Sequence, residues 1–322
     1  MGKIGHIYFH SPCFDGIVSS VIVWDFLAIH QKWSDAILHS VNYDAREGWL
    51  SSKLESPSAV VDFLYHPGTQ LWADHHQTTF LSHAARFDFE KRKSEWMMYN
   101  PRSDSCARLI WNQIQEAFGH KNRRFQTMVQ WADKIDSAHY ESVEEAIFGD
   151  APAMRIRSSI VLPGAREQAE DLIRALRVDS LEVVASLPTV SDRHNQVLSL
   201  TEVGLNRIKE SARIQSNGIV VFDVDATDVI INRYAAYYFF PAARYSVGAV
   251  RSTKGTSITA MRNPWREFES IPLGTIFEKF GGGGHQRVAS VFLPTDRASE
   301  YGLILKRIVQ EIAITDLTPK GV

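Results

Sequence analysis

Cysteine is scarce in this chain, and the two cysteines that are present stand far apart. Cys13 and Cys106 form no C-x-x-C pair, which excludes a disulfide scaffold and the common cysteine-based structural zinc sites. A chain without structural disulfides suits a reducing compartment, so we expect a cytoplasmic protein. The first ten residues also lack the apolar core of a signal peptide.

Net charge and long hydrophobic runs are lacking as well. The 35 Lys and Arg residues nearly balance the 37 Asp and Glu residues, and the formal net charge is −2. The sequence therefore predicts no global basic field that would attract long nucleic acids. The aromatic-rich run from Tyr234 to Phe240 is too short to span a bilayer, so no membrane partner is expected. A phosphate-bearing substrate would have to be bound locally, by a metal or by a few arginines.

The chain does have the length and composition of a two-domain globular protein. Its 322 residues are 44% hydrophobic and 22% charged, which is ordinary for folded proteins and longer than is usual for one core. We expect a first domain at 1–189, a connecting helix at 190–212 and a second domain at 213–322.

Short apolar segments alternate with helical patterns in the first half of the chain. Strands are predicted at 5–9, 59–61 and 71–73, and helices at 16–27, 105–118 and 125–135. Asp15 is the predicted N-cap of the first helix. Such alternation predicts an α/β fold with a doubly wound, mostly parallel sheet.

The last hundred residues predict a second, smaller α/β domain. Its strands are predicted at 218–222, 245–251, 257–261 and 288–293, with a final helix at 298–312. Four consecutive glycines, Gly281 to Gly284, stand within this domain and precede His285. A glycine run is often a flexible linker, but glycines also let backbone N–H groups approach a phosphate closely. The residues alone leave both interpretations open.

Three aspartates follow the predicted strands of the first domain. Asp15 comes just after the first strand, and Asp62 and Asp74 end the next two. A single aspartate after a strand is more often a cap or a turn residue. In an open parallel sheet, however, ligands bind at the carboxyl ends of the strands, where three carboxylates would converge and repel unless a cation holds them. Neighbouring histidines shift the expected ion from Mg2+ toward Mn2+ or Zn2+.

Several short motifs resemble those of the DHH phosphoesterases, in the order of that superfamily. Asp74-His75-His76 is the tripeptide that names it. The other matching segments are His10 to Gly16, Val60 to Asp62, Ser105 to Ile110, Trp131 to Asp133 and Gly281 to His285, the last resembling the DHH-associated C-terminal domain. The resemblance extends from about His6 to Leu293. The superfamily includes RecJ-type exonucleases, nano-RNases, phosphoadenosine phosphate phosphatases and cyclic-dinucleotide phosphodiesterases.

The resemblance implies a role for each matching residue. The implied metal ligands are His10, Asp15, Asp62, His75 and Asp133, with Asp62 bridging two ions. The implied catalytic residues are His76, which would face the substrate phosphate, and Asp74, which would orient a histidine, with Asp136 held in reserve for that role. The implied substrate-binding residues are Arg262, Gly282, Gly283, Gly284 and His285. Without the resemblance, Arg262 would equally suit a solvated strand end.

One residue departs from the family pattern. The first motif of the superfamily has an aspartate two residues before its Asp-Gly step, where this chain has Cys13. A thiolate there would favour zinc or iron over manganese, while a lone cysteine is also a common space filler. We expect one firmly held divalent metal and a weak second position. Mn2+ is the expected ion, with Zn2+, Fe2+ and Mg2+ as alternatives.

The expected function is hydrolysis of phosphoester bonds in a short oligonucleotide or small nucleotide by metal-activated water. The near-neutral net charge argues against tight binding of long DNA. One alternative is a pyrophosphate or polyphosphate hydrolase, which Arg262 and the glycine run would also suit. Another is a non-catalytic nucleotide-binding regulator in which Cys13 marks a lost metal. A homodimer is left open as the assembly.

Overall fold

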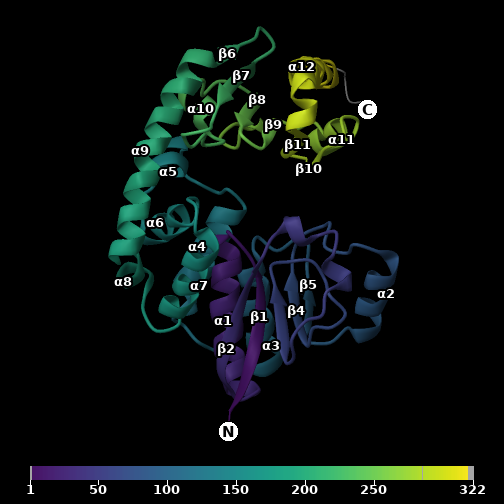
Figure 1. Ribbon diagram of the computed structural model, residues 1–322, viewed down its shortest axis with the longest axis vertical. Coiled ribbons are helices and arrows are strands. Elements are labelled where there is room, and N and C mark those ends of the chain that lie inside the picture. The colour runs from purple at the N-terminus through teal and green to yellow at the C-terminus, as the bar shows by residue number, and fades with distance from the viewer. Residues whose placement is uncertain (1, 285, 318–322) are drawn as a thin grey trace. The chain divides into compact units, whose positions relative to one another are not determined.

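The computed structural model describes residues 2–284 and 286–317, which belong to two compact units (Figure 1). The first unit contains the residues up to His139 together with Asp150–Asn195, and the second contains Tyr140–Gly149 and the residues from Gln196 onward. This division differs from the expected boundaries at 189 and 213. Helix α9 (Pro188–Ser211) runs through the boundary, and the indole N–H of Trp265 donates to the backbone oxygen of Tyr140 at 3.0 Å, which ties the 140–149 segment to the second unit.

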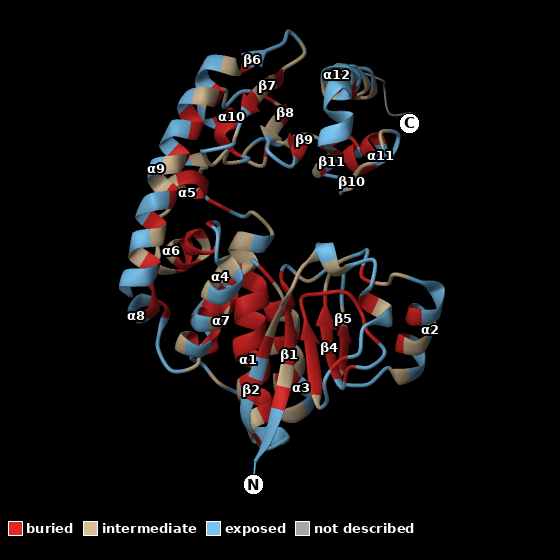
Figure 2. Ribbon diagram, in the orientation of Figure 1, coloured by how far each residue is buried: buried red, intermediate tan, exposed pale blue. Residues whose placement is uncertain are grey.

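The first unit is built on a parallel sheet of five strands in the order β2-β1-β3-β4-β5. The strands are β1 (Lys3–His10), β2 (Trp33–Val41), β3 (Ser58–Val61), β4 (Leu71–Asp74) and β5 (Met97–Tyr99). The predicted α/β class is confirmed. Strands β3 and β4 are buried along their whole length (Figure 2), because both faces of a parallel sheet are covered.

Alternate residues of these strands face two different hydrophobic cores. Ile7, Val61 and Ala73 pack with helices α1 and α3, whereas Val60 and Trp72 pack with α2 on the opposite face. The helices of this unit are α1 (Phe14–His30), α2 (His83–Arg92), α3 (Cys106–Phe118), α4 (Phe125–Asp136), α6 (Pro152–Ser159), α7 (Ala165–Leu176) and α8 (Leu181–Ala185), with 3-10 turns η1 (Tyr43–Ala45) and η2 (Trp49–Ser51).

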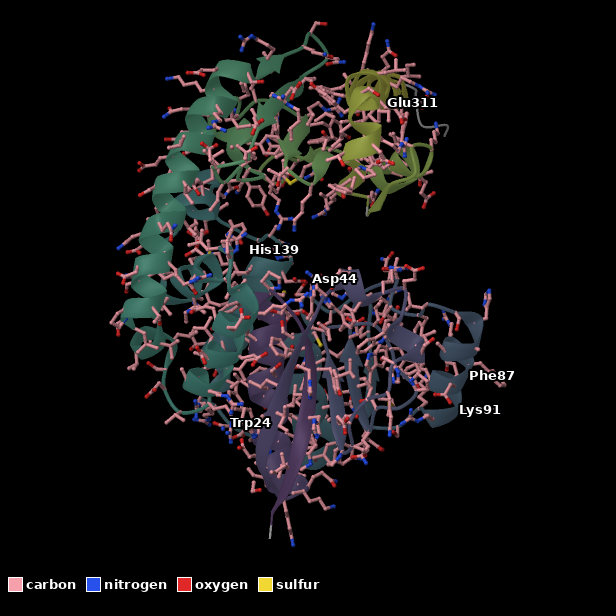
Figure 3. All side chains as sticks on the ribbon, in the orientation of Figure 1. Trp24, Asp44, Phe87, Lys91, His139 and Glu311 are labelled. Carbon is pink, nitrogen blue, oxygen red and sulfur yellow. The ribbon has the colours of Figure 1, made fainter. Side chains whose placement is uncertain are left out.

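Two cationic side chains of the first unit pack against aromatic rings of its helices. The ammonium of Lys91 lies 4.4 Å from the ring centre of Phe87 on the exposed side of α2 (Figure 3). The guanidinium of Arg177 lies 3.8 Å from the ring centre of the buried Trp24 in α1. Both cations therefore cover aromatic surface while keeping a polar end in water.

The second unit contains a mixed sheet of six described strands in the order β10-β11-β9-β8-β7-β6. Strands β7 and β8 pair in parallel, and the other pairs between these described strands are antiparallel. Helices α11 and α12 pack against this sheet to form its core. The strands are β6 (Arg213–Ile214), β7 (Ile219–Asp225), β8 (Tyr245–Ser252), β9 (Gly255–Arg262), β10 (Gly283–Gly284) and β11 (Val288–Pro294). The helices are α5 (Val143–Phe148), α10 (Ala235–Phe239), α11 (Leu273–Glu278), η3 (Thr295–Glu300) and α12 (Tyr301–Leu317).

One predicted boundary in the first unit is wrong. Helix α1 begins at Phe14 with Cys13 as its N-cap, whereas the sequence predicted Asp15 in that position. Asp15 is in the first helical turn, and its carboxylate accepts hydrogen bonds from the start of α3 instead. No helix among residues 2–284 and 286–317 is long and apolar enough to cross a membrane.

Candidate metal centre

Three neighbouring strands bring their carboxyl ends to one edge of the first sheet. Strand β1 ends at His10, β3 is followed by Asp62, and β4 ends at Asp74. Strand β3 pairs in parallel with both β1 and β4. The three residues therefore lie at neighbouring points of the edge where open parallel sheets bind their ligands.

Asp62 is at the centre of this edge and is 0% exposed. Its backbone has a φ of 56°, a left-handed conformation that costs a non-glycine residue about 1–3 kcal/mol. Its Oδ2 lies 3.4 Å from Nδ1 of His10, and its Oδ1 lies 3.8 Å from both Nε2 of His75 and Nδ1 of His76. Within the described part of the chain, neither oxygen has a hydrogen-bond partner. A buried carboxylate in this state is costly unless a cation compensates it.

Asp15, His75 and Asp136 form a further group of donor atoms beside Asp62. Nε2 of His75 lies 3.2 Å from Oδ2 of Asp136 and 3.7 Å from Oδ2 of Asp15. Nδ1 of His75 lies 3.0 Å from the backbone oxygen of Ser103, which can accept only from a protonated nitrogen. This contact assigns the proton of a neutral His75 to Nδ1 and leaves Nε2 with the lone pair that a metal requires.

The start of helix α3 holds the Asp15 carboxylate in place. The backbone N–H of Cys106 donates to Oδ2 at 2.7 Å, and that of Ala107 donates to Oδ1 at 2.9 Å. These are the first two residues of the helix, whose N–H groups have no partner within the helix. Asp15 is therefore fixed by donors that also favour its anionic form.

The structure differs from the sequence prediction at helix α4. The sequence predicts Asp133 as a metal ligand, but its carboxylate accepts hydrogen bonds from Nε of Arg108 at 2.9 Å and from Oγ of Ser105 at 2.7 Å. Asp136, one turn further along the helix, lies beside His75 instead. The structure thus brings Asp136 into the site and leaves Asp133 paired outside it.

The loop between β1 and α1 contributes His10 and Cys13. A ring nitrogen of His10, Sγ of Cys13 and a carboxylate oxygen of Asp62 all lie within 4.8 Å of one another. Gly16 permits this approach, because a Cβ atom there would lie 2.2 Å from the backbone oxygen of His10 and 3.4 Å from Oδ2 of Asp62. The glycine of the Asp-Gly step is therefore required because the start of α1 packs closely against the end of β1.

Asp74 forms hydrogen bonds within and near its own tripeptide. Its Oδ1 accepts from the backbone N–H of His75 at 2.8 Å and lies 2.7 Å from Nδ1 of His76. Its Oδ2 accepts from the hydroxyl of Thr79. This arrangement suits the orienting role that the resemblance implies, with His76 as the histidine that is oriented.

The buried carboxylates alter the pKa values of the histidines near them. Burial alone would lower the pKa of His75, but the carboxylate of Asp136 at 3.2 Å and the charge of Asp15 raise it to about 11. Burial likewise opposes the effect of Asp74, which raises the pKa of His76 to about 9. Burial and neighbouring carboxylates raise the pKa of Asp15 well above its ordinary range. The site therefore has an excess of negative charge that protons or metal cations can neutralise.

The donor atoms of this edge fit divalent cations. The described residues provide three groups of possible ligand atoms, and within each group the atoms lie within 4.8 Å of one another. Asp62 belongs to two of these groups. The groups are His10-Cys13-Asp62, Asp62-His75-His76 and Asp15-His75-Asp136. The buried atoms without partners in the described residues include Nδ1 of His10, both carboxylate oxygens of Asp62 and Nε2 of His75. Such a set of oxygen and nitrogen donors suits a metal ion rather than a polar side chain.

The glycine-rich segment of the second unit is an ordered strand pair and not a flexible linker. Gly283 and Gly284 form β10, which pairs antiparallel with β11. A Cβ atom at Gly282 would lie 2.4 Å from the backbone oxygen of Ser290, so this close approach requires glycine. His285, a predicted substrate-binding residue, lies outside the described residues.

Arg262, at the end of β9, is held by the loop that follows it. Its Nη1 donates to the backbone oxygen of Asn263 at 3.0 Å. Its Nη2 donates to the backbone oxygens of Arg266 at 2.7 Å and Phe268 at 2.8 Å. Its guanidinium carbon lies 4.3 Å from the ring centre of Phe268. The side chain therefore anchors this loop, and its role in phosphate binding stays a prediction.

Comparisons with known proteins identify the fold. No protein-family model matches the sequence, and no curated protein matches it. Among solved structures, the pGpG-specific phosphodiesterase PggH from Vibrio cholerae is similar with a TM-score of 0.71 and 16% identity, over 97% of this chain and 100% of that chain. RecJ from Thermus thermophilus in complex with Mn2+ is similar with a TM-score of 0.60 and 14% identity, over 97% of this chain and 52% of that chain. The DHH domain of a member of a ribosomal protein family is similar with a TM-score of 0.56 and 12% identity, over 97% and 87% of the two chains.

The chain has the DHH fold. The predicted α/β fold with two sheet-containing parts is thus confirmed over nearly the whole chain. The matched part of RecJ is about half of that protein, whereas PggH is matched over its full length.

Some residues of this candidate site carry no signal in the sequence. Tyr43, in the 3-10 turn η1, lies with its ring centre 5.2 Å from that of His10 and is 37% exposed. Ser103 and Thr79 fix His75 and Asp74 through hydrogen bonds from loop positions. Motif spacing could not reveal these contacts, because they depend on how the loops fold over the strand ends.

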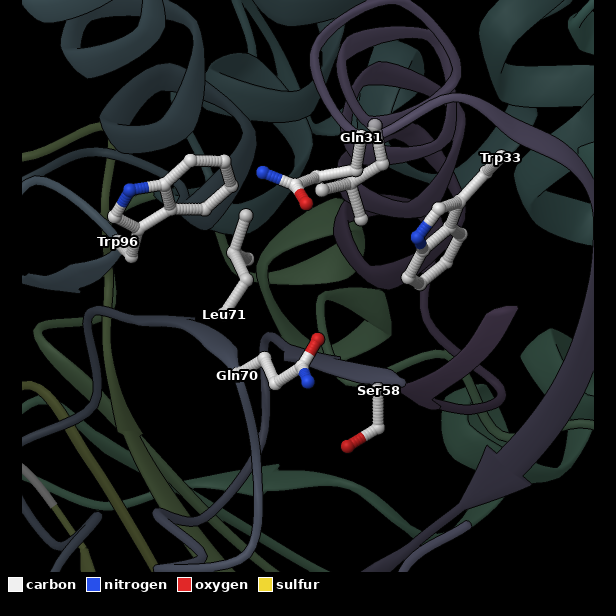
Figure 4. Close-up of a pocket in the computed structure, with 7 residues that line it drawn as sticks. Gln31, Trp33, Ser58, Gln70, Leu71 and Trp96 are labelled. Carbon is white, nitrogen blue, oxygen red and sulfur yellow. The ribbon is translucent and has the colours of Figure 1, made fainter. Parts of the chain in front are cut away.

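A small cavity of about 100 Å³ lies at the opposite edge of the five-stranded sheet of the first unit (Figure 4). It is lined by Leu27, Gln31, Trp33, Ser58, Gln70, Leu71 and Trp96. Ser58 and Leu71 begin strands β3 and β4, whose other ends lead to Asp62 and Asp74. The cavity is therefore separate from the metal centre.

Proposed function

We propose that this chain is a metal-dependent phosphoesterase that hydrolyses phosphoester bonds in a small nucleotide or short oligonucleotide. The observation that carries the proposal is the buried Asp62 carboxylate, which has no hydrogen-bond partner in the described chain and lies between two groups of ligand atoms. The fold supports it, because PggH is by name a pGpG-specific phosphodiesterase and RecJ by name an exonuclease. RecJ structures contain Mn2+ or Mg2+.

The best-supported cation position lies among Asp15, Asp62, His75 and Asp136. Three carboxylates and one imidazole suit Mn2+, which we propose as the ion, with Mg2+, Zn2+ and Fe2+ as alternatives. When bound, such an ion supplies Lewis-acid stabilisation of phosphoryl charge and an activated water. The neighbouring His10 nitrogen and the second oxygen of Asp62 remain available to bind a second cation.

Asp74 and His76 would together position a hydrogen-bond donor for the substrate beside this centre. Asp74 binds Nδ1 of His76 and thereby fixes the orientation of the ring. The opposite nitrogen, Nε2, is then the one that can donate to a phosphoryl oxygen. His76 keeps 25% of its side chain exposed, as contact with a substrate requires. A ring whose orientation is fixed before binding loses little conformational entropy when the substrate arrives.

The short substrate is inferred from charge and from the relatives. With a net charge of −2, the chain lacks the basic field that retains long nucleic acids. The ordered backbone of Gly282, Gly283 and Gly284 supports the proposal that this segment binds a substrate phosphate through N–H groups. Arg262 is proposed as its neighbour in that role.

A hydrolysis screen tests this function. Linear pGpG, a graded series of oligonucleotides, cyclic dinucleotides, phosphoadenosine phosphate and polyphosphate would each be incubated with Mn2+, Mg2+, Zn2+ or a chelator. We expect metal-dependent cleavage that is fastest on the shortest nucleotides and absent with the chelator. Turnover of polyphosphate alone would favour the phosphoanhydride hydrolase. Binding without any turnover would favour the non-catalytic regulator.

A further inference from the structure

Cys13 is the N-cap residue of helix α1, but its side chain does not cap the helix. Its backbone oxygen accepts the N–H of Ile17 at 3.1 Å, as the first bond of α1 requires. Its side chain, however, makes no capping hydrogen bond, although serine, threonine, asparagine and aspartate usually fill this position with an accepting oxygen. Cys13 is also only partly buried, so a role as apolar filler does not account for it either.

The surroundings of Cys13 point to a ligand independently of the cysteine. Asp62 is 0% exposed, and its two carboxylate oxygens have no hydrogen-bond partner in the described chain. Nδ1 of His10 is buried and equally without a partner. A ring nitrogen of His10 and a carboxylate oxygen of Asp62 each lie within 4.8 Å of Sγ of Cys13. One sulfur, one nitrogen and one oxygen donor thus meet where the buried nitrogen and oxygen have no hydrogen-bond partner among the described residues.

The two donor sets beside Asp62 differ in chemical softness. Asp15, His75 and Asp136 offer two carboxylates and one imidazole, a set suited to Mn2+ or Mg2+. His10 and Cys13 offer an imidazole and a thiol, and thiolates favour zinc, iron and cobalt over manganese. Asp62 has one oxygen toward each set, since Oδ2 lies nearer His10 and Oδ1 nearer His75.

We propose that His10, Cys13 and Asp62 form a second cation position that prefers a soft divalent ion such as Zn2+, Fe2+ or Co2+, so that the centre holds two different metals that share Asp62. This inference rests on the proposed function for the harder position at Asp15, His75 and Asp136. Binding of the ion by Cys13 replaces the thiol proton, which is released to solvent.

Cobalt spectroscopy tests the sulfur ligand directly. Metal-free protein would be titrated with Co2+ as wild type, Cys13→Ser, Cys13→Asp and Cys106→Ala. We expect a near-ultraviolet thiolate-to-cobalt charge-transfer band in the wild type and its loss in both Cys13 variants. Cys106→Ala is the matched control and should keep the band, because Sγ of the fully buried Cys106 donates to the backbone oxygen of Ala73 and belongs to none of the groups of metal-ligand atoms found among the described residues.

Elemental analysis after dialysis against equal Mn2+ and Zn2+ provides the second readout. We expect the wild type to bind zinc at least tenfold more tightly than Cys13→Ser, and Cys13→Asp to bind more manganese than the wild type. A wild type without the charge-transfer band, and with the same zinc content as Cys13→Ser, would overturn the inference. In that case, Mn2+-dependent hydrolysis by both proteins would leave the proposed function intact, whereas absence of all metal binding would overturn both.

Discussion

Asp62 and Arg262 are charged residues at strand ends, one in each unit, and their surroundings are opposite. The carboxylate of Asp62 is buried and has no hydrogen-bond partner in the described chain, whereas the guanidinium of Arg262 donates to three backbone oxygens. A satisfied charge stabilises the fold that surrounds it, and an unsatisfied buried charge indicates a ligand that completes it. The contrast therefore separates a residue of the metal centre from a residue that anchors a loop.

The largest effect is expected from Asp62→Asn. The amide keeps the shape but removes the charge shared by two ligand groups, so metal affinity should fall by more than about a hundredfold and hydrolysis below detection. Titration calorimetry with Mn2+ and circular dichroism would check affinity and fold. Asp192→Asn, at an exposed position of α9, is the matched control and should retain both. Equal Mn2+ affinity in the two variants would remove Asp62 from the centre.

Substitution of two neighbouring aspartates of α4 should distinguish an effect on metal binding from an effect on the stability of the fold. Asp136→Asn is expected to weaken Mn2+ binding about ten- to hundredfold, because the carboxylate beside His75 loses its charge. Asp133→Asn should leave that affinity unchanged but lower the free energy of unfolding by about 1–3 kcal/mol, because Arg108 loses its charged partner. Calorimetric titration and chemical denaturation measure the two quantities. The reverse pattern would restore Asp133 as the ligand.

A moderate effect is expected from Gly16→Ala. The added Cβ would lie 2.2 Å from the backbone oxygen of His10, so the first turn of α1 must shift away from the strand end. We expect roughly tenfold weaker metal binding, because donor atoms displaced by a few tenths of an ångström no longer share one ion. Gly48→Ala, where no atom lies within 4 Å of the new Cβ, is the control. Identical Mn2+ affinities of the two variants would contradict the steric argument.

The smallest effect on the metal centre is expected from Arg262→Ala. Loss of the hydrogen bonds to the loop at 263–268 should lower the free energy of unfolding by about 1–3 kcal/mol, and Mn2+ affinity should not change. Thermal denaturation and substrate kinetics would be measured on the same samples. We also expect a ten- to hundredfold loss in substrate use, because Arg262 is proposed to bind a substrate phosphate. Unchanged kinetics would show that Arg262 only anchors its loop.

The sequence predicts the centre of the fold better than its edges. Strands β3 and β4 are short buried runs, of which β3 is followed by Asp62 and β4 ends at Asp74, so both their existence and their end points could be predicted. The edge strands β2 and β5 were missed, because β2 has mixed exposure and β5 has three residues. Sequence patterns also could not tell Asp133 from Asp136, because the choice depends on where Arg108 of α3 lies in three dimensions.

Anomalous diffraction from crystals soaked in Mn2+ tests the central claim most directly. We predict an anomalous peak at the carboxyl edge of the first sheet, bonded to Asp62 and to donor atoms of Asp15, His75 and Asp136. A peak at this edge that does not contact Asp62, or no peak there under conditions that support hydrolysis, would contradict the account.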